Sequence, residues 1–546
     1  MAQRLIGLLG LLVLLGLAWL LSYHKKRIKL KSVFWGVGLQ LLFAIIILRE
    51  DVWSFVGLGV LGLLLVTYIM QKEDSRFGGG VKSAIVFVLI SIALGTCLYF
   101  VSPVLGYMLL LIVLFLILNS IFKWNQLVQR YVGAAFVVGG VSYLVSHGFY
   151  GRIIFKNFSD KVAGFLQLSD YGARFLFANL ADNSFFGPWE TNFPFPDSWP
   201  GFGFQFAFKV LPTIIFFGGF MSVLYHLGIM QKVISAMSKF MRWTIGTSGA
   251  ETLSCSANIF VGQTEAPLLI KPFLDKMTKS ELLTIMVGGF ATIAGGVLAG
   301  YIAMGVPAGH LVAASVMSAP AALVIGKIIY PELEHSETAG DVDLPSIKVG
   351  DNVIEAAANG ITDGLKLAVN VGAMLIGFIA LIAVIDVILN WLDLLIDGRL
   401  LKGEYVKYSA SGMSPAVGEY TGFFPGSLQT FFGSILRPLA WVMGVSWEYA
   451  DKVGNLLGIK LSLNEFVAYG TLGNYIKDGV LNERAIVIAT YALCGFANFS
   501  SIGIQIGGIS AVSPSRKSDL AKIGLKAMFG GAIASFMTAT IAGILL

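Results

Sequence analysis

The feature of this sequence that most restricts its fold is a series of apolar stretches, each about 20 residues long. A helix of that length crosses the hydrocarbon core of a bilayer. The stretches recur along all 546 residues, of which 56% are hydrophobic and 13% charged, with a mean hydropathy of +0.79. No soluble protein of this length could bury so much apolar surface. We therefore expect an all-α polytopic membrane protein in a lipid bilayer.

The first stretch, residues 5–21, is followed by the basic run His-Lys-Lys-Arg-Ile-Lys-Leu-Lys at 24–31. Positive charge after the apolar segment, with no small-residue cleavage site before it, indicates a retained helix rather than a signal peptide. Basic loops favour the cytoplasmic side, so this run predicts an external N-terminus. The net charge of +6 is the same cytoplasmic excess, and we expect no nucleic-acid partner.

Later basic clusters keep the same side if each apolar stretch crosses once. The single crossings expected on this basis are residues 33–48, 53–70, 83–101, 104–122, 131–146, 206–227 and 312–329. Residues 149–204, rich in Pro, Phe and Trp, are then external and partly interfacial. The acidic stretch after residue 330 is cytoplasmic, and the C-terminus is external.

Residues 251–273 do not fit a lipid-facing helix, because polar residues alternate there with Gly262 and Pro267. Backbone breaks at membrane depth only where protein or a water-filled cavity surrounds it. We therefore expect a re-entrant hairpin with its tip at 262–267. Glu265 lies in this tip, and a carboxylate in apolar surroundings costs several kcal/mol unless a partner compensates it. The glycine-rich residues 288–301 that follow favour a discontinuous helix.

The second half repeats this pattern. Glu465 is followed by Gly-Phe-Ala at 495–497, as Glu265 is followed by Gly-Phe-Ala at 289–291, and in each half the tripeptide is expected to open a helix rich in small residues. A single long crossing at about 365–389 separates the halves, so the second repeat is expected to be inverted. Its hairpin would span about 448–475. Interrupted apolar segments at matching places in two halves point to a transport site near the middle of the membrane.

Two other classes of function have little support. A membrane enzyme would need a catalytic constellation, and neither HExxH nor GxSxG occurs. The three cysteines are too widely spaced for a disulfide framework or a metal site. A passive channel would not need two polar hairpins, and accumulation against a gradient would separate it from a transporter.

Several long segments resemble the signature motifs of the concentrative nucleoside transporter family. They are NIFVGQTEAPLLIKPF, GGFATIAGGVLAGYIAMGVP, NEFVAY and CGFANFSSIGI, with VLPTIIFFGGFMSVLYHLGIMQ and GVSWEYADKVGNLLGIKL as flanking helices. The resemblance covers residue 206 to the C-terminus and, more loosely, residues 1–49. Residues 51–156 have no counterpart in the shorter bacterial members and are interpreted as four additional crossings.

This resemblance implies a division of the chain and a set of site residues. The expected parts are N-terminal helices 1–50, the insert 51–156, an external segment 157–205, a first repeat 206–330, an acidic loop 331–363 and a second repeat 364–546. The residues expected at the nucleoside base are Gln263, Thr264, Glu265 and Val297. Those expected at the ribose are Glu465, Asn498 and Ser501, with Phe496 against the ligand ring. Sodium is expected to bind Asn258, the Val261 carbonyl, the Thr292 hydroxyl and the Ile293 carbonyl.

Each of these assignments has a structural alternative. Glu265 and Glu465 could be helix caps or members of ion pairs, and Phe496 could be ordinary core. Asn258 and Thr292 could hydrogen-bond across packed helices. The resemblance also implies sodium-driven symport of nucleosides such as uridine and adenosine, elevator-type movement, and a homotrimer. A proton-coupled carrier of the same family is the alternative. A bacterial inner membrane is the expected location.

Overall fold

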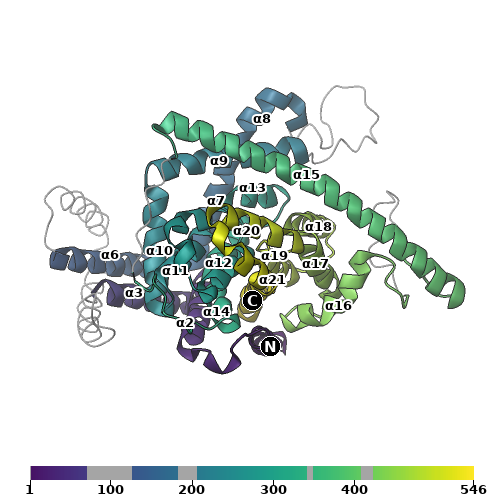
Figure 1. Cartoon of the computed structure of the whole chain (residues 1–546), viewed down its shortest axis with the longest axis horizontal. Helices are drawn as coiled ribbons and strands as arrows, with labels where there is room; N and C mark the ends of the chain where they lie inside the picture. The colour runs from purple at the N-terminus through teal and green to yellow at the C-terminus, as the bar shows by residue number, and fades with distance from the viewer. Residues whose placement is uncertain (1, 71–125, 182–205, 341–348, 408–421) are drawn as a thin grey trace. The chain divides into compact units, whose positions relative to one another are not determined.

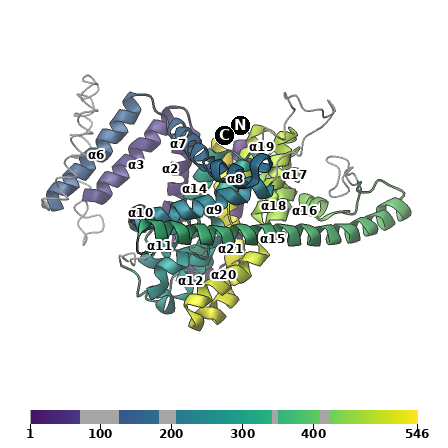
Figure 2. The ribbon, with the colours of Figure 1, turned by 90° about the horizontal axis from the view of Figure 1, so that it is seen from above.

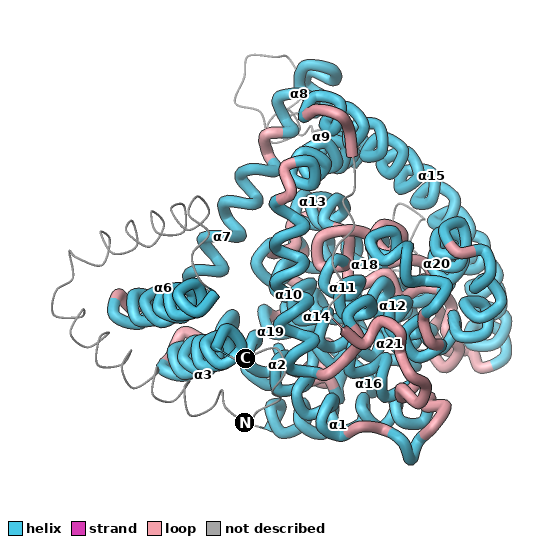
Figure 3. Tube along the Cα trace, turned by 60° about the vertical axis from the view of Figure 1, so that its left-hand side comes forward, coloured by secondary structure: helices cyan, strands magenta, loops and turns pink. Residues whose placement is uncertain are grey.

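The computed structural model describes residues 2–70, 126–181, 206–340, 349–407 and 422–546. Every regular element in these residues is a helix (Figure 3), which confirms the all-α prediction. The expected crossings at 83–101 and 104–122 lie outside the described residues, as do parts of the external segment and of the acidic loop. The chain forms two compact units, one of residues 1–37, 159–544 and 546, the other of 38–158 and 545.

The smaller unit contains α3 (Val52–Met70) and α6 (Gln126–Ser146), with the end of α2 (Leu30–Leu48) and the start of α7 (Gly151–Leu166). α3 packs on α6, where a Cβ added at Gly62 would lie 3.1 Å from Val141. The buried Ser54 hydroxyl donates to the Ile46 carbonyl at 3.1 Å and accepts from the Gly151 amide at 3.0 Å. These bonds satisfy backbone groups at two helix ends, where no partner within the helix exists.

Seven helices among the described residues are long and apolar enough to cross a membrane. They are α1 (Ala2–Leu20), α2, α3, α9 (Phe206–His226), α14 (Ala308–Ile329), the span Ile379–Leu400 at the end of α15 (Val353–Asp393), and α21 (Lys517–Leu545). A π-helical segment, Leu394–Leu400, continues α15.

In the larger unit, α15 is a single helix of 41 residues, which corresponds to about 60 Å (Figure 2). It packs on α9, and glycines on both helices bring the backbones together. A Cβ added at Gly218 would lie 2.7 Å from the carbonyl oxygen of Gly360 and 3.0 Å from the Cα of Gly364. Small residues spaced four apart are the usual means of close helix contact in membranes.

Most of the other helices of the larger unit form two series (Figure 1). After α8 (Ser169–Phe177) and α10 (Ile229–Ile245), the first series is α11 (Gly249–Ala257), the 3-10 segment η4 (Ala266–Lys276), α12 (Lys279–Ala291), α13 (Gly295–Ala303) and α14. After α16 (Leu428–Val442), the second is α17 (Ala450–Ser462), α18 (Glu465–Lys477), α19 (Glu483–Leu493), α20 (Phe499–Val512) and α21. Each series has two short helices joined by a turn, then an interrupted helix, then a long helix.

The two interruptions have different local causes. After α12, Thr292 adopts an extended conformation with φ −117° and ψ 163°, and α13 begins at Gly295. After α19, Gly495 has φ +128°, which L side chains rarely adopt. A Cβ on Gly495 would lie 2.5 Å from the carbonyl oxygen of Phe290, so the two interruptions lie against each other.

The Gly-Phe-Ala tripeptides do not occupy equivalent places. The first, at 289–291, ends α12 rather than opening a helix, and the second, at 495–497, lies inside the interruption before α20. The expectation that both open a helix is wrong. Gly289 lies close to the Gln505 side chain, since an added Cβ would be 2.6 Å from its nitrogen, whereas Gly495 is needed for its positive φ.

Candidate functional site

Glu465 is the first residue of α18 and is only 4% exposed. The Asn464 side chain caps this helix by accepting from the Val467 amide at 2.9 Å, so Glu465 lies at the positive end of the helix dipole. The Tyr301 hydroxyl donates to Glu465 Oε1 at 3.1 Å, and Asn498 Nδ2 donates to Oε2 at 3.3 Å. Three separate elements therefore position this carboxylate.

A second polar contact joins the two halves of the chain. Gln263, in the turn between α11 and η4, donates from Nε2 to the Ser501 hydroxyl of α20 at 3.3 Å. Gln505, one turn further along α20, donates from its Nε2 to Gln263 Oε1 at 3.0 Å and to the Met286 carbonyl at 3.2 Å. All these side chains are buried. The tip of the first hairpin is thus held against the second discontinuous helix.

Asn498 links the two contacts. It is the N-cap of α20, and its Oδ1 accepts from the Ser501 amide at 2.9 Å and from the Ser500 hydroxyl at 2.7 Å. Its Nδ2 faces Glu465. Of the residues predicted at the ribose, Glu465, Asn498 and Ser501 therefore form one connected group in the structure.

The residues predicted to contact the nucleoside base differ in their burial and their contacts. Thr264 lies against α20, because a Cβ added at Gly508 would meet its Cγ2 at 2.8 Å. Glu265 is exposed, unlike Glu465, and interacts electrostatically with Tyr225 of α9. Its carboxylate lies over Gly262, where a Cβ would be 2.2 Å from Oε2. The carboxylate at this tip is therefore solvent-accessible rather than buried.

The two apolar residues of the prediction differ in burial. Val297 on α13 is 3% exposed, and Phe496 in the second interruption is half-buried. The Phe496 carbonyl accepts from the Asn498 amide at 2.9 Å, which places Phe496 beside the Glu465 group.

The four residues predicted at sodium converge on the first interruption. Asn258 is the C-cap of α11 and is fully buried, yet neither Oδ1 nor Nδ2 has a hydrogen-bond partner among the described residues. Gly288 of α12 lies beside it, since an added Cβ would be 3.3 Å from Nδ2. Thr292 and Ile293 are 1% exposed, and the Thr292 hydroxyl donates to the Gly288 carbonyl at 2.9 Å. The Gly295 amide donates to the Phe260 carbonyl, which neighbours Val261, at 3.2 Å.

A buried amide without a hydrogen-bond partner destabilises the folded protein unless a ligand binds it. Amide, hydroxyl and carbonyl oxygens are the donors that a hard cation takes. The residues at the first interruption therefore fit a sodium ion.

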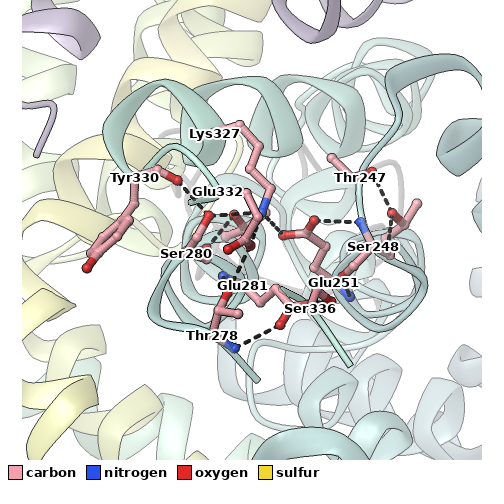
Figure 4. Close-up of polar contacts among 12 residues, drawn as sticks. Thr247, Ser248, Glu251, Thr278, Ser280, Glu281, Lys327, Tyr330, Glu332 and Ser336 are labelled. Carbon is pink, nitrogen blue, oxygen red and sulfur yellow. Dashed lines mark hydrogen bonds and ion pairs between the residues drawn. The ribbon is translucent and has the colours of Figure 1, made fainter. Parts of the chain in front are cut away.

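A separate charged cluster lies at the base of the first hairpin (Figure 4). The Lys327 ammonium, near the end of α14, is 2.8 Å from Glu251 Oε2 and 3.2 Å from Glu332 Oε2, and donates to the Ser280 hydroxyl at 2.9 Å. Glu251 has no exposed surface and also accepts from the Ser248 amide at 2.7 Å. This ion pair joins the start of α11 to the end of α14.

Glu281 completes the same cluster. It accepts from the Ser336 and Thr338 hydroxyls, both at 2.6 Å, and from the Thr278 amide at 2.8 Å. Thr278 and Glu281 form a capping box at the start of α12. The cluster fixes helix ends, and none of its members belongs to the predicted site.

Three residues of the site region are absent from the sequence-based prediction. Tyr301, Gln505 and Lys460 all lie within apolar runs and are fully buried. A polar or charged residue isolated in an apolar run is the signal that could have found each of them. Their partners are set by tertiary contacts.

Models of three protein regions match this chain. "Na+ dependent nucleoside transporter C-terminus" matches residues 310–543, "Nucleoside recognition" matches 207–308, and "Na+ dependent nucleoside transporter N-terminus" matches 9–69. An "Uncharacterized transporter" of Haemophilus influenzae is 41% identical over 81% of this chain and 97% of that protein. "Sodium/nucleoside cotransporter 1" of Mus musculus is 40% identical over 76% of this chain, which spans 59% of the mouse protein.

Solved structures of a similar protein also match this chain. The transporter CNTnw in an inward-facing, substrate-bound state is 31% identical, with a TM-score of 0.69 over 99% of this chain and 98% of that one. A variant of CNTnw in an outward-facing state has a TM-score of 0.71 and 31% identity, over 100% of this chain and 98% of that one. The same fold therefore occurs in states open to opposite sides.

Proposed function

This chain belongs to the family of sodium-dependent nucleoside transporters, and from that premise we propose that it imports nucleosides by sodium symport with elevator-type alternating access. It is a membrane transporter rather than an enzyme, and sodium is the coupling ion of the family. The observation that supports a nucleoside site most strongly is the connected group of Glu465, Asn498 and Ser501.

The chemistry of this group suits a ribose. A carboxylate accepts hydrogen bonds from two hydroxyls, and an amide and a hydroxyl both donate and accept. The sugar hydroxyls would replace the present contacts of Glu465 and Ser501. Phe496 would offer an apolar face to the ligand ring.

The first hairpin would form the contacts with the nucleoside base. Gln263 presents both a donor and an acceptor, Thr264 a hydroxyl and Glu265 an acceptor, while Val297 would contact the ring. Glu265 is exposed, so we assign it a place at the open side of the site. Uridine and adenosine are the test substrates.

Sodium would bind at the first interruption. The ligands we propose are Asn258, the carbonyls of Val261 and Ile293, and the Thr292 hydroxyl. The fully buried, unpartnered Asn258 amide supports this assignment. None of the four titrates near neutral pH, which favours sodium over a proton as the driving ion.

For the movement, we propose that the two hairpins and their discontinuous helices travel as one body past α9 and α15. The Gln263–Ser501 contact, which joins the two series, supports a common body. Inward- and outward-facing structures of a transporter with the same fold support alternating access.

We further propose a homotrimer in a bacterial inner membrane, with both termini external. The apolar side chains that α15 exposes support burial against lipid or another copy, among them Ile376, Ile379, Val387, Ile388 and Trp391. Cross-linking of a purified protein in lipid would count the copies.

The central experiment is uptake of radiolabelled uridine and adenosine into proteoliposomes. With an inward sodium gradient and an interior-negative potential, nucleoside should accumulate inside above its outside concentration. One charge crossing 100 mV provides about 2.3 kcal/mol, which permits roughly 50-fold accumulation. Equilibration without accumulation would indicate a channel, and accumulation driven fully by a proton gradient in sodium-free vesicles would indicate proton coupling.

A further inference from the structure

Lys460, near the end of α17, is a fully buried lysine in the second half of the chain. Its ammonium donates to the carbonyl of Ala492 at 2.8 Å and to that of Cys494 at 3.5 Å. It also lies 5.5 Å from the centroid of the Phe536 ring of α21. No carboxylate lies within ion-pair distance of it in the part of the chain that the structure describes.

Carbonyl oxygens thus compensate the charge of Lys460, whereas carboxylates compensate that of Lys327. Ala492 and Cys494 are at the C-terminal end of α19, where carbonyls lack partners within the helix and the helix dipole is negative. The face of an aromatic ring adds further attraction. The end of α19 at this interruption therefore holds a cationic group, and that group is a side chain of the protein itself.

Lys460 has a definite counterpart in the first half. It lies three residues before Leu463, the C-cap of α17, and Cys255 lies three residues before Asn258, the C-cap of α11. Both helices open a hairpin, and both ends approach an interrupted helix. In the first half this place carries an uncharged thiol next to the unpartnered Asn258 amide.

The two interruptions are also in direct connection. The Ser535 hydroxyl of α21 is 2.5 Å from the Cys494 carbonyl and 3.5 Å from the Ala291 carbonyl. Lys460 in turn interacts electrostatically with Glu465. A charge at the second interruption is therefore close to both the first interruption and the carboxylate proposed to hold the ribose.

We propose that Lys460 is a tethered cation that takes, at the second interruption, the place that sodium takes at the first, so that the chain couples one sodium ion to each nucleoside. This inference rests on the proposed sodium symport. It assigns a positioning role to Lys460: the ammonium holds the carbonyl end of α19 and places a positive charge near Glu465. No second sodium ion is then required.

The first test uses the unmodified protein. The sodium-to-nucleoside ratio is obtained from the membrane potential that stops net uridine flux in proteoliposomes at known gradients. A ratio of one is expected, and a ratio of two overturns the inference while leaving sodium symport intact. Absence of any sodium-dependent flux would instead contradict the proposed function.

The second test changes the side chain. Lys460→Met keeps the length and removes the charge, Lys460→Arg keeps the charge, and Lys452→Met on the same helix, where Lys452 pairs with Asp451 at 3.3 Å, is the matched control. For Lys460→Met we expect the Hill coefficient for sodium to rise from one toward two and the half-saturating sodium concentration to rise at least about fivefold. Lys460→Arg and the control should keep a coefficient of one.

Folded Lys460→Met with unchanged sodium dependence would overturn the inference. If that variant is folded but does not transport, binding of radioactive sodium to the purified protein decides. Two ions per chain support the inference, and one contradicts it. If the variant does not fold, the ratio measured for the unmodified protein decides.

Discussion

The two series of helices share one architecture, but a largely buried lysine in the first and a fully buried lysine in the second make different contacts. Lys327 of the first series lies at the base of the hairpin, between the carboxylates of Glu251 and Glu332. Lys460 of the second lies at the interruption itself, against backbone carbonyls. The lysine of the first series therefore holds helix ends together. The lysine of the second series lies at the helix interruption, and in our proposal it takes there the place that sodium takes in the first series.

The two glutamates differ in the same way. Glu465 is buried and held by Tyr301 and Asn498, whereas Glu265 is exposed at the hairpin tip. A buried carboxylate with two donors is pre-organised for a ligand, and an exposed one remains partly bonded to water. The halves are thus repeats in backbone order and unequal in chemistry.

The largest expected effect comes from Lys327→Met. Removing one partner of a buried ion pair leaves Glu251 uncompensated, which typically costs about 3–5 kcal/mol. We expect a markedly lower melting temperature of the purified protein in detergent, with partial recovery when Glu251→Gln is added. Lys366→Met is the control, because its pair with Asp363 is exposed. An unchanged melting temperature would mean that the cluster does not hold the hairpin.

Next in size is the contrast between Glu465→Gln and Glu265→Gln. A hydrogen bond to a charged group contributes about 1.5–3 kcal/mol. Loss of the buried carboxylate should therefore lower the uptake rate at subsaturating uridine by about 10- to 100-fold. Glu265→Gln should lower it less, because water shares its bonds. Equal losses for the two variants would remove the distinction between the halves.

Asn258→Ala should act on sodium rather than on nucleoside. Losing one oxygen ligand is expected to raise the half-saturating sodium concentration by roughly tenfold, which equals about 1.4 kcal/mol. The matched change in the second half is Asn455→Ala, since Asn455 is buried in α17 and donates to the Tyr475 hydroxyl at 2.9 Å. It should leave the sodium dependence unchanged. A tenfold shift in both variants would point to a general packing effect.

The smallest effect concerns the link between the end of η4 and the junction of α20 and α21. Hydrogen bonds from Ser513 and Ser515 lower the pKa of Asp275 below its usual 3.8. A carboxyl with a lowered pKa stabilises the folded state above its usual pKa, and that contribution disappears as the pH falls through the lowered value. Ser513→Ala should therefore change uptake at neutral pH by less than about twofold. Its melting temperature should begin to converge with that of the unmodified protein as the pH falls below the usual pKa of 3.8, and a difference that does not shrink there would contradict the assignment.

Much of the candidate site could be proposed from the sequence because its residues are chemically conspicuous. Asn258, Gln263 and Glu465 are polar in apolar stretches, and such residues in a membrane protein are costly unless they are used. The contacts between individual pairs of these residues could not be predicted from the sequence. The Tyr301–Glu465 bond joins residues 164 positions apart, and the Gln263–Ser501 bond joins residues 238 apart. No local pattern encodes such a pairing.

The sequence alone was enough to predict that the protein is a helical membrane protein. Apolar stretches of membrane length require helices, since a helix satisfies its own backbone groups in lipid. Polar residues and glycines within such stretches marked the places where helices break. Only the tertiary structure decided the exposure of Glu265, the burial of Lys460 and the different places of the two Gly-Phe-Ala tripeptides. Burial and charge compensation depend on groups brought together from distant parts of the chain, and those groups become neighbours only when the helices pack.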